Sequence, residues 1–208
     1  MKQTVKTSRT AGLLEKMFRA LNVNYFNSEL EEPIITIQST PKAYGHVTVG
    51  RAWRKGQEKR HELNIGAGTL DRPIEDITAT LLHEMVHLWN IHENIQDCSR
   101  GGQYHNKRFR EVAEVCDLKI SYDKRIGWSI TEPTAPLCDF IIEQGWTDIN
   151  MSRVEWACAG PSTGKKPTVG GVSSSTRKYI CPKCGMSVRA TKDVRIKCMD
   201  CDLRMILQ

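Results

Sequence analysis

Long apolar runs are missing from this sequence of 208 residues. None approaches the roughly 18 consecutive apolar residues that a membrane-spanning helix needs. The first residues, MKQTVKTSRTAG, are basic but no apolar core follows them, so they do not resemble a secretory signal. We therefore expect a cytoplasmic protein, nucleoid-associated or nuclear locations included, with no membrane partner. Thiols stay reduced in those compartments, so the eight cysteines favour metal binding over disulfides.

The charge is distributed unevenly along the chain. The whole sequence carries a net charge of +6. Residues 1–159 hold 20 Lys and Arg against 21 Asp and Glu, whereas residues 160–208 hold 10 against 3. A basic tail on a near-neutral body indicates a polyanionic partner for the tail. The alternative is a tail that is basic only for solubility.

A segment rich in Gly, Ser, Pro and Thr divides the chain. It reads GPSTGKKPTVGGVSSST, residues 160–176, and contains no large apolar residue, which is typical of a flexible linker. We therefore predict a globular domain over residues 8–157, a linker over 158–176 and a small module over 177–208. The last module is too short to build a stable core alone, so it needs a covalent or metal staple.

Apolar periodicity predicts an α+β fold, with helices packed on a small three-stranded sheet. The predicted helices are residues 11–27, 71–93 and 105–117, and the predicted strands are residues 34–40, 43–54 and 61–67. A charged segment with a glycine, residues 54–60, is expected to be a hairpin loop. Asp71 is predicted to cap the second helix. We expect residues 119–157 to be irregular, apart from a short amphipathic segment near 137–146.

The stretch HEMVH, residues 83–87, places two histidines four positions apart on the predicted second helix. Residues at this spacing lie on one helix face, so His83 and His87 can hold one zinc ion. The intervening Glu84 can act as general base for attack on a peptide carbonyl. The alternative is a solvent-facing helix that carries the motif by chance.

A catalytic zinc site usually has three protein ligands and one open position. His105 is the favoured third ligand, because it follows a loop with two glycines and opens the predicted third helix. His92 is a poor candidate, since it lies about 140° from the motif's face by the helical period. A carboxylate is the other choice, because some zinc peptidases use one. The carboxylate candidates are Glu93, Glu111 and Glu114.

Two CxxC pairs lie in the C-terminal module, Cys181 with Cys184 and Cys198 with Cys201, separated by thirteen residues. Four cysteines at this spacing predict a closed, tetrahedral zinc site of the structural kind. We therefore expect two Zn²⁺ ions, one catalytic and one structural. The remaining cysteines show no ligand spacing and are expected to be buried or incidental thiols.

Basic side chains with interspersed aromatics predict nucleic-acid contacts, with a single strand favoured. The predicted contacts are Trp53, Arg54, Lys55 and Arg60 in the hairpin, and Lys178, Tyr179, Lys183, Arg189, Arg195 and Lys197 in the C-terminal module. The alternatives are a solvated hairpin with its tryptophan in the core, and a C-terminal module that contacts only protein.

HEMVH (83–87), GGQYHNKRF (101–109) and the two CxxC pairs together resemble the SprT-like zinc metalloproteases. That family includes the Spartan proteases, which digest DNA–protein crosslinks. The resemblance covers roughly residues 10–150 and the C-terminal module. It implies a minimal zincin-like protease domain followed by a zinc ribbon. It also implies that DNA binding restricts cleavage to proteins held near DNA.

By motif position, the resemblance assigns the catalytic zinc to His83, His87 and His105 and the base role to Glu84. The sequence departs from the commonest family pattern around the third ligand. The family often has Gly-His-Gly there, whereas this chain has Tyr104-His105-Asn106, with its glycines at 101 and 102.

The predicted function is therefore a zinc-dependent endopeptidase acting on DNA-associated proteins. Tyr104 and Tyr122 are candidates for a second oxyanion stabiliser. Substrate backbone is expected to pair with a sheet edge near residues 43–50. Two alternatives stay open: a non-proteolytic nucleic-acid-binding zinc protein, and a metallopeptidase whose ribbon recognises protein and not DNA.

Overall fold

The computed structural model describes residues 7–40, 43–153, 177–190 and 193–207. The chain divides into two compact units, residues 1–157 and 158–208. The predicted linker, residues 158–176, lies outside the described residues. No helix in the described part of the chain is long and apolar enough to cross a membrane.

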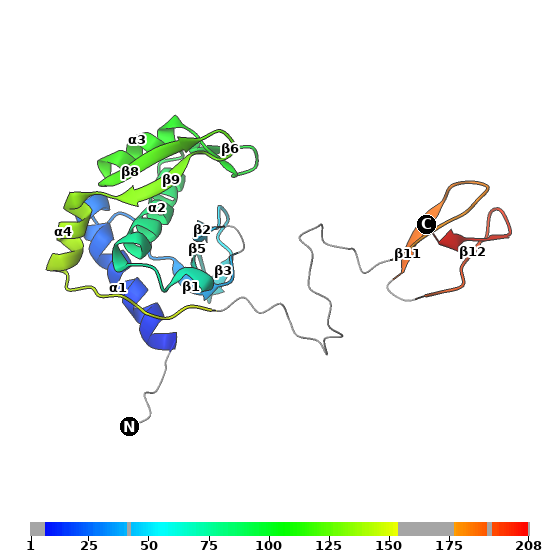
Figure 1. The fold of residues 1–208 in the computed structure, drawn as a ribbon, viewed down its shortest axis with the longest axis horizontal. Helices are drawn as coiled ribbons and strands as arrows, with labels where there is room; N and C mark the ends of the chain where they lie inside the picture. Colours follow the sequence, from blue (N-terminus) through cyan, green and yellow to red (C-terminus); the bar gives the residue numbers. More distant parts are fainter. Residues whose placement is uncertain (1–6, 41–42, 154–176, 191–192, 208) are drawn as a thin grey trace, which may run out of the picture. The chain divides into compact units, whose positions relative to one another are not determined.

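The described residues of the first unit contain four α-helices, and α2 is central among its elements (Figure 1). They are α1 (Thr7–Phe26), α2 (Ile74–His92), α3 (Lys107–Val115) and α4 (Ala135–Glu143). The other three helices all contact α2, as do strands from two different sheets. As a result most α2 residues are buried, including polar His83 and Glu84. The alternative of a solvent-facing helix is therefore wrong for α2.

A three-stranded sheet packs on one side of α2 with the order β1-β5-β2. Its strands are β1 (Ile34–Gln38), β2 (Gly45–Val47) and β5 (Glu62–Gly66). β1 runs parallel to β5, and β2 runs antiparallel to β5 at the edge. Leu63 and Ile65 of β5 are fully buried because β5 is the central strand.

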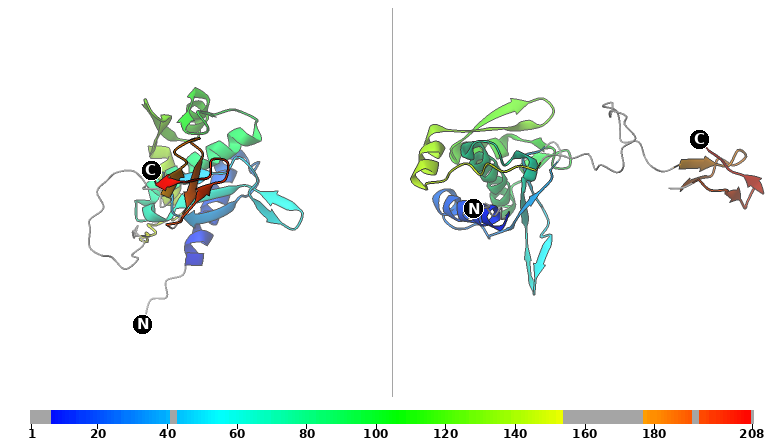
Figure 2. Two further views of the ribbon diagram at one scale, coloured as in Figure 1. Left: turned by 90° about the vertical axis from the view of Figure 1, so that its right-hand side faces the viewer. Right: turned by 60° about the horizontal axis from the view of Figure 1, so that its bottom comes forward.

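The predicted strand 43–54 is two strands that belong to different sheets. After β2, the chain leaves the ladder and forms β3 (Trp53–Lys55), which pairs with β4 (Glu58–Arg60) through a turn at Gly56. Gly56 has a φ of +62°, the left-handed region that glycine enters without a Cβ penalty. Figure 2 shows this β3–β4 hairpin extending away from the rest of its unit.

A second, four-stranded sheet contradicts the prediction that residues 119–157 are irregular. It contains β6 (Cys98–Ser99), β7 (Tyr104–His105), β8 (Leu118–Asp123) and β9 (Gly127–Pro133) in the order β6-β7-β9-β8. β8 has an alternating pattern in which Leu118 and Ile120 are buried. That period of two is the ordinary sign of a strand, and it is inconsistent with an irregular segment. The α+β class is confirmed, but the sheet content is larger than predicted.

The predicted cap of the central helix is also corrected. α2 begins at Ile74 after Pro73, and no side chain of the preceding residue caps it. The Ile74 N–H instead donates to Asp148 Oδ1 at 2.8 Å. The cap therefore comes from a residue 74 positions later, which local sequence signals cannot indicate, and Asp71 does not serve this role.

The second unit is a set of short strands around a very small core. Its strands are β10 (Arg177–Ile180), β11 (Ser187–Ala190), β12 (Lys197–Cys198), β13 (Leu203–Arg204) and β14 (Ile206–Leu207). Among the described residues, the buried cluster here consists of Tyr179, Cys181, Cys198 and Met205. Two of those four are members of the CxxC pairs, so the core of this unit is built around the cysteines.

Candidate metal centres

Three histidines from two elements converge in the first unit. α2 supplies His83 and His87, and β7 supplies His105. Their Nε2 atoms are close: the His105 atom lies 3.2 Å from that of His83 and 3.0 Å from that of His87. Two tetrahedral zinc ligands at usual Zn–N lengths would place their nitrogens about 3.3 Å apart. The spacing therefore fits a shared metal ion.

The Nδ1 atom of each histidine has its own partner, and these partners fix the direction of the Nε2 lone pairs. His87 Nδ1 lies 2.6 Å from Asp97 Oδ2, and His105 Nδ1 lies 3.4 Å from the Ile126 carbonyl oxygen. Both partners can only accept, so we assign the Nδ1 proton to each imidazole. Each Nε2 is then a lone-pair donor to a metal.

His83 follows the same arrangement through a hydroxyl. Its Nδ1 lies 2.7 Å from Thr131 Oγ1. That hydroxyl donates its single proton to the Ser129 carbonyl oxygen at 3.2 Å, so it accepts from His83 Nδ1. Nε2 of His83 is therefore also unprotonated. All three ring partners come from outside α2, on the segments that frame the site.

The charge state of the cluster is consistent with metal ligation. Burial lowers the pKa of His83 well below its ordinary value, and neighbouring His87 and His105 lower it further. Burial and His87 lower the pKa of His105 to about 4. His83 and His105 are therefore neutral at pH 7, and their Nε2 lone pairs would face one another across 3.2 Å. A cation bound between these nitrogens would remove that repulsion, so this set of donors fits zinc.

Glu84 lies on α2 between the two helix histidines and is buried, with only 5% of its surface exposed. Burial raises the pKa of Glu84 to about 7, in the range that suits a general base near neutral pH. Strand β2 passes directly against this carboxylate. A methyl group added at Gly45 would lie 3.1 Å from Glu84 Oε1 and 2.9 Å from the Asn64 carbonyl oxygen.

His105 does not open α3 as predicted, but it lies two residues before the first residue of that helix, Lys107. It belongs to β7, and Asn106 is the N-cap of α3, with its side chain accepting from the Arg108 and Phe109 N–H groups. The predicted convergence on the HEMVH face is nonetheless present. Two of the carboxylate alternatives are engaged elsewhere, since Glu93 pairs with His92 and Glu114 pairs with Arg110.

Asp97 is the residue near this site that the sequence did not reveal. It accepts from His87 Nδ1 and from Asn90 Nδ2, and the latter contact is 3.1 Å long. Its backbone carbonyl accepts from the Asn106 N–H at 2.9 Å. Asp97 thus connects the helix ligands to the segment that carries His105. No sequence motif marks it, because its partners are seven to ten residues away.

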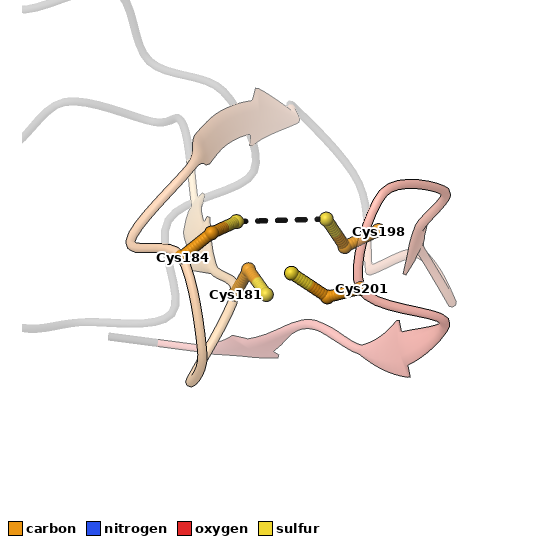
Figure 3. Close-up of side chains that lie close together, drawn as sticks. All are labelled: Cys181, Cys184, Cys198 and Cys201. Atoms are coloured by element: carbon orange, nitrogen blue, oxygen red, sulfur yellow. Dashed lines mark hydrogen bonds between the residues drawn. The ribbon is translucent and has the colours of Figure 1, made fainter.

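The four cysteines of the second unit form the other candidate site. Figure 3 shows their sulfur atoms facing one another. Cys184 Sγ and Cys198 Sγ are 3.7 Å apart, and the four ligand atoms all lie within 4.8 Å of one another. Tetrahedral zinc thiolates place sulfurs about 3.8 Å apart. The arrangement therefore fits a closed four-cysteine zinc site.

The thiol pKa values in this cluster differ from one another. Backbone N–H groups of Cys184 and Lys183 lower the pKa of Cys181 to about 6. Hydrogen bonding with Cys184 is the main cause that raises the pKa of Cys201 to about 12. Without a metal, the Cys181 thiolate is thus stabilised chiefly by backbone N–H groups, and the Cys184 and Cys198 thiols add to this. A bound zinc ion would take all four as thiolates and release their protons.

The predicted nucleic-acid residues of the hairpin have mixed surroundings. Trp53 is 43% exposed, and its Nε1–H donates to Glu62 Oε2 at 2.8 Å. Arg60 forms ion pairs with Glu31 at 2.9 Å and Glu58 at 2.7 Å. Arg54 is exposed, and the side chain of Lys55 lies outside the described part. Trp53 is therefore not a core residue.

In the second unit, the prediction that Tyr179 stacks on a base is wrong. Its ring is 4% exposed, and its hydroxyl donates to Asp193 Oδ1 at 2.6 Å while accepting from the Val194 N–H. A buried, doubly bonded tyrosine offers no face to a base. The predicted basic contacts lie around it, and most of them are exposed. The exposed ones are Lys183, Arg189, Arg195 and Lys197, while Lys178 is half-buried.

Tyr104 and Tyr122 do not match the predicted role at the oxyanion. Their hydroxyl groups lie 3.1 Å apart and hydrogen-bond each other. Both line an open pocket together with Asn106, Lys107 and Trp128. That pocket is separate from the convergence point of the histidines, because successive side chains of a strand point to opposite faces and Tyr104 directly precedes His105 in β7.

Comparison with known proteins gives one match. The sequence profile of the SprT-like family matches residues 14–126, which contain α2, β7 and all three histidines of the cluster. No curated protein and no solved structure matches the chain.

Proposed function

The chain belongs to the SprT-like family, whose domain is of the metallopeptidase type. On this basis we propose that the protein is a zinc-dependent endopeptidase that acts on DNA-associated proteins. The observation that carries the proposal is the convergence of three Nε2 lone pairs beside a buried glutamate on the same helix. In this proposal His83, His87 and His105 hold the catalytic zinc. The first unit is then a minimal zincin-like protease domain.

The chemistry divides between the metal and Glu84. When bound, zinc would supply a Lewis acid that activates water and polarises the scissile carbonyl. Glu84 takes a proton from the attacking water at its carboxylate and passes it to the leaving amine. Its pKa of about 7 suits both steps, because the group can hold a proton and release it near neutral pH.

Substrate backbone is proposed to pair with β2. Gly66 N–H donates to the Tyr44 carbonyl at 2.7 Å, and Thr48 N–H donates to the Glu62 carbonyl at 3.0 Å. Since hydrogen-bonded pairs alternate in an antiparallel ladder, the N–H and C=O groups of Gly45 and Val47 point away from β5. They form a free strand edge beside Glu84, and an extended peptide can add to such an edge.

The proposed role of DNA is based on the second unit. Its exposed basic residues surround a four-cysteine site that would hold the structural zinc. A basic ribbon of this kind tracks a phosphate backbone by charge. We propose that the ribbon holds DNA, with Arg54 of the hairpin as a further contact, and that cleavage is directed to proteins crosslinked to that DNA. The corresponding location is the cytoplasm, nucleoid or nucleus.

One observation favours the second candidate function, a metallopeptidase whose ribbon recognises protein. Apolar side chains are unusually exposed in this unit, and clustered apolar exposure marks protein-binding surfaces. The exposed apolar residues are Met186, Val188, Val194, Met199, Leu203, Ile206 and Leu207. Cleavage that is indifferent to DNA would favour this candidate.

The test is cleavage of a DNA-binding protein by the zinc-loaded full chain and by Glu84→Gln. Each is assayed without DNA, with single-stranded DNA and with duplex. We expect cleavage that requires both Glu84 and DNA. Equal cleavage without DNA would support the peptidase activity and contradict its dependence on DNA. Absence of cleavage in every arm, with two zinc ions bound, would favour a non-proteolytic nucleic-acid-binding protein.

A further inference from the structure

A set of aromatic and basic side chains covers the sheet next to His105 and takes no part in the proposed chemistry. We call it the aromatic–basic patch, and it is carried by β7, β8, β9, the start of α3 and the β6–β7 and β8–β9 turns. Its members are Arg100, Tyr104, Lys107, Arg110, Tyr122, Arg125 and Trp128. Tyr104, Lys107, Tyr122 and Trp128 line a common open pocket of about 440 Å³ together with Asn106.

Of the three rings of the patch, Tyr122 is exposed, whereas Tyr104 and Trp128 are half-buried and Trp128 packs against the core. Tyr122 is 49% exposed, and its ring centroid lies 5.2 Å from that of Trp128 at an angle of 55°. The hydroxyl of Tyr122 bonds that of Tyr104. An exposed tyrosine held at its hydroxyl and at one edge of its ring is a preorganised stacking platform.

Guanidinium groups extend this surface. Arg100 lies over the Tyr104 ring at 4.7 Å from its centroid, and Arg110 lies over the Trp128 ring at 4.4 Å. An arginine stacked on a ring presents a flat cationic face to solvent. Such a face can stack on a nucleobase or bond a phosphate. The combination of ring and guanidinium therefore matches both parts of a nucleotide.

The charge around the patch has one dominant sign. Residues 98–110 contain four Lys or Arg and no Asp or Glu, and residues 121–128 contain two basic residues and one acidic residue, Asp123. Two of these cations have carboxylate partners, since Arg110 pairs with Glu114 and Arg125 pairs with Asp123. These segments are adjacent in space, because His105 N–H donates to the Ile126 carbonyl at 2.9 Å. Residues 1–159 as a whole are near neutral. The positive charge is therefore concentrated beside the candidate catalytic centre.

We propose that the aromatic–basic patch binds single-stranded nucleic acid, with a base stacked on Tyr122 and phosphates held by Lys107 and Arg125. Open rings among cations are the features that bind a single strand without base-specific readout. The inference deepens the proposed function and rests on it for its biological role. It places a nucleic-acid contact on the protease unit itself, next to a metal ligand and apart from the ribbon.

The first test compares charge reversals that alter net charge equally. The variant Lys107→Glu with Arg125→Glu acts in the patch, and the control Arg9→Glu with Lys16→Glu acts on exposed positions of α1. Binding of the full chain to labelled oligothymidylate and oligouridylate is measured across salt concentrations. We expect the patch variant to lose at least about tenfold in affinity, with a salt slope smaller by about 1.4 for two phosphates. The control should bind like wild type.

Stacking is tested at Tyr122 alone. Tyr122→Phe keeps the ring and Tyr122→Ala removes it, so the two variants separate stacking from the hydroxyl bond to Tyr104. We expect Tyr122→Phe to bind within about twofold of wild type and Tyr122→Ala to bind at least about fivefold more weakly. Equal affinity of both variants with wild type would overturn the stacking role.

Photocrosslinking locates the contact directly. The Glu84→Gln chain is irradiated with an oligonucleotide carrying iodouracil, and the crosslinked peptides are mapped. We expect adducts within residues 100–128 as well as in the ribbon. Adducts confined to residues 177–207 would reject the patch and leave the proposed function standing. Adducts in the patch without any DNA-dependent cleavage would retain the patch and reject the DNA-directed protease.

Discussion

Gly127 of β9 lies so close to His105 of β7 that a methyl group at Gly127 would be 2.1 Å from the His105 carbonyl oxygen. Gly127 also has a φ of +74°. Only glycine combines that conformation with that approach. The pairing of these residues places the third histidine against the first two.

Gly127→Ala is therefore expected to displace His105 and remove the metal ion that we propose at the histidine site. We expect the purified variant to hold one zinc per chain where wild type holds two, measured by elemental analysis. Gly145→Ala is the control, because Gly145 has a similar φ of +66° but open space at its Cβ. The control variant is expected to lose only about 1–2 kcal/mol of stability, which is the backbone cost of a left-handed conformation for alanine. Two zinc ions in Gly127→Ala would contradict the positioning role.

Asp97→Asn should weaken zinc binding at the histidine site by about 10- to 100-fold. The change keeps the shape of the side chain but removes the carboxylate charge that orients His87. Affinity is measured by competition with a chelator. Asp117→Asn is a matched control, since Asp117 is a carboxylate bonded to Tyr25 and unrelated to the histidines. Equal losses in both variants would indicate a general stability effect.

Gly45→Ala should reduce activity while leaving both zinc ions in place. The added methyl group would contact Glu84 and the Asn64 backbone, and a shift of the base by even 1 Å can cost on the order of 100-fold in rate. The measurement is kcat together with zinc content. Gly50→Ala adds the same group in open space and should be fully active. Normal kcat in Gly45→Ala would refute the close packing of β2 on Glu84.

Val47→Pro tests pairing of substrate with β2. The Val47 N–H points away from β5, so proline removes a donor to substrate without breaking the sheet's own ladder. We expect kcat/KM for protein substrates to fall roughly fivefold or more, in line with a lost hydrogen bond of about 1 kcal/mol. Val49 lies beyond the end of β2, so Val49→Pro is expected to lower kcat/KM by a smaller factor. Unchanged kcat/KM in Val47→Pro would exclude pairing of the substrate backbone with the β2 edge.

Cys184→Ser should unfold the second unit alone. The ribbon's small core depends on its cysteines, so losing the metal removes most of its folding free energy. All five tryptophans precede residue 158, so tryptophan fluorescence reports only on the first unit. We expect unchanged fluorescence melting, one zinc fewer and loss of dispersed amide signals from residues 177–207. Cys138→Ser, which is outside both clusters, should keep both zinc ions.

Local sequence patterns predicted the elements whose signals lie within a few residues. The three helices and the first strands appear near their expected positions, because apolar periodicity over a window reports the face that is buried. The HEMVH motif placed two histidines and Glu84 correctly on one helix, since helical spacing alone fixes their relation. The CxxC pairs indicated a four-cysteine cluster because two cysteines only three positions apart can bind one metal ion.

The errors share a physical cause. The prediction that residues 119–157 are irregular is wrong, although β8 shows an alternating burial pattern. The prediction of one strand over residues 43–54 is also wrong, because these residues belong to two sheets. Tyr179 was assigned to a nucleic-acid surface, but it is the center of a core that forms only when the ribbon folds. In each case burial depends on residues distant in sequence, and composition alone does not report it.

The local spacing of three imidazoles, one carboxylate and four thiols was enough to predict two candidate metal sites, because only a few kinds of site use these spacings. What surrounds these residues depends on the tertiary structure. It placed Asp97, Thr131 and Ile126 behind the histidines, set Gly127 against His105 and laid β2 along Glu84. It also gathered the aromatic–basic patch from two separate segments. Ligand spacing is a property of the local chain, whereas orientation, burial and surface charge arise only when distant segments pack together.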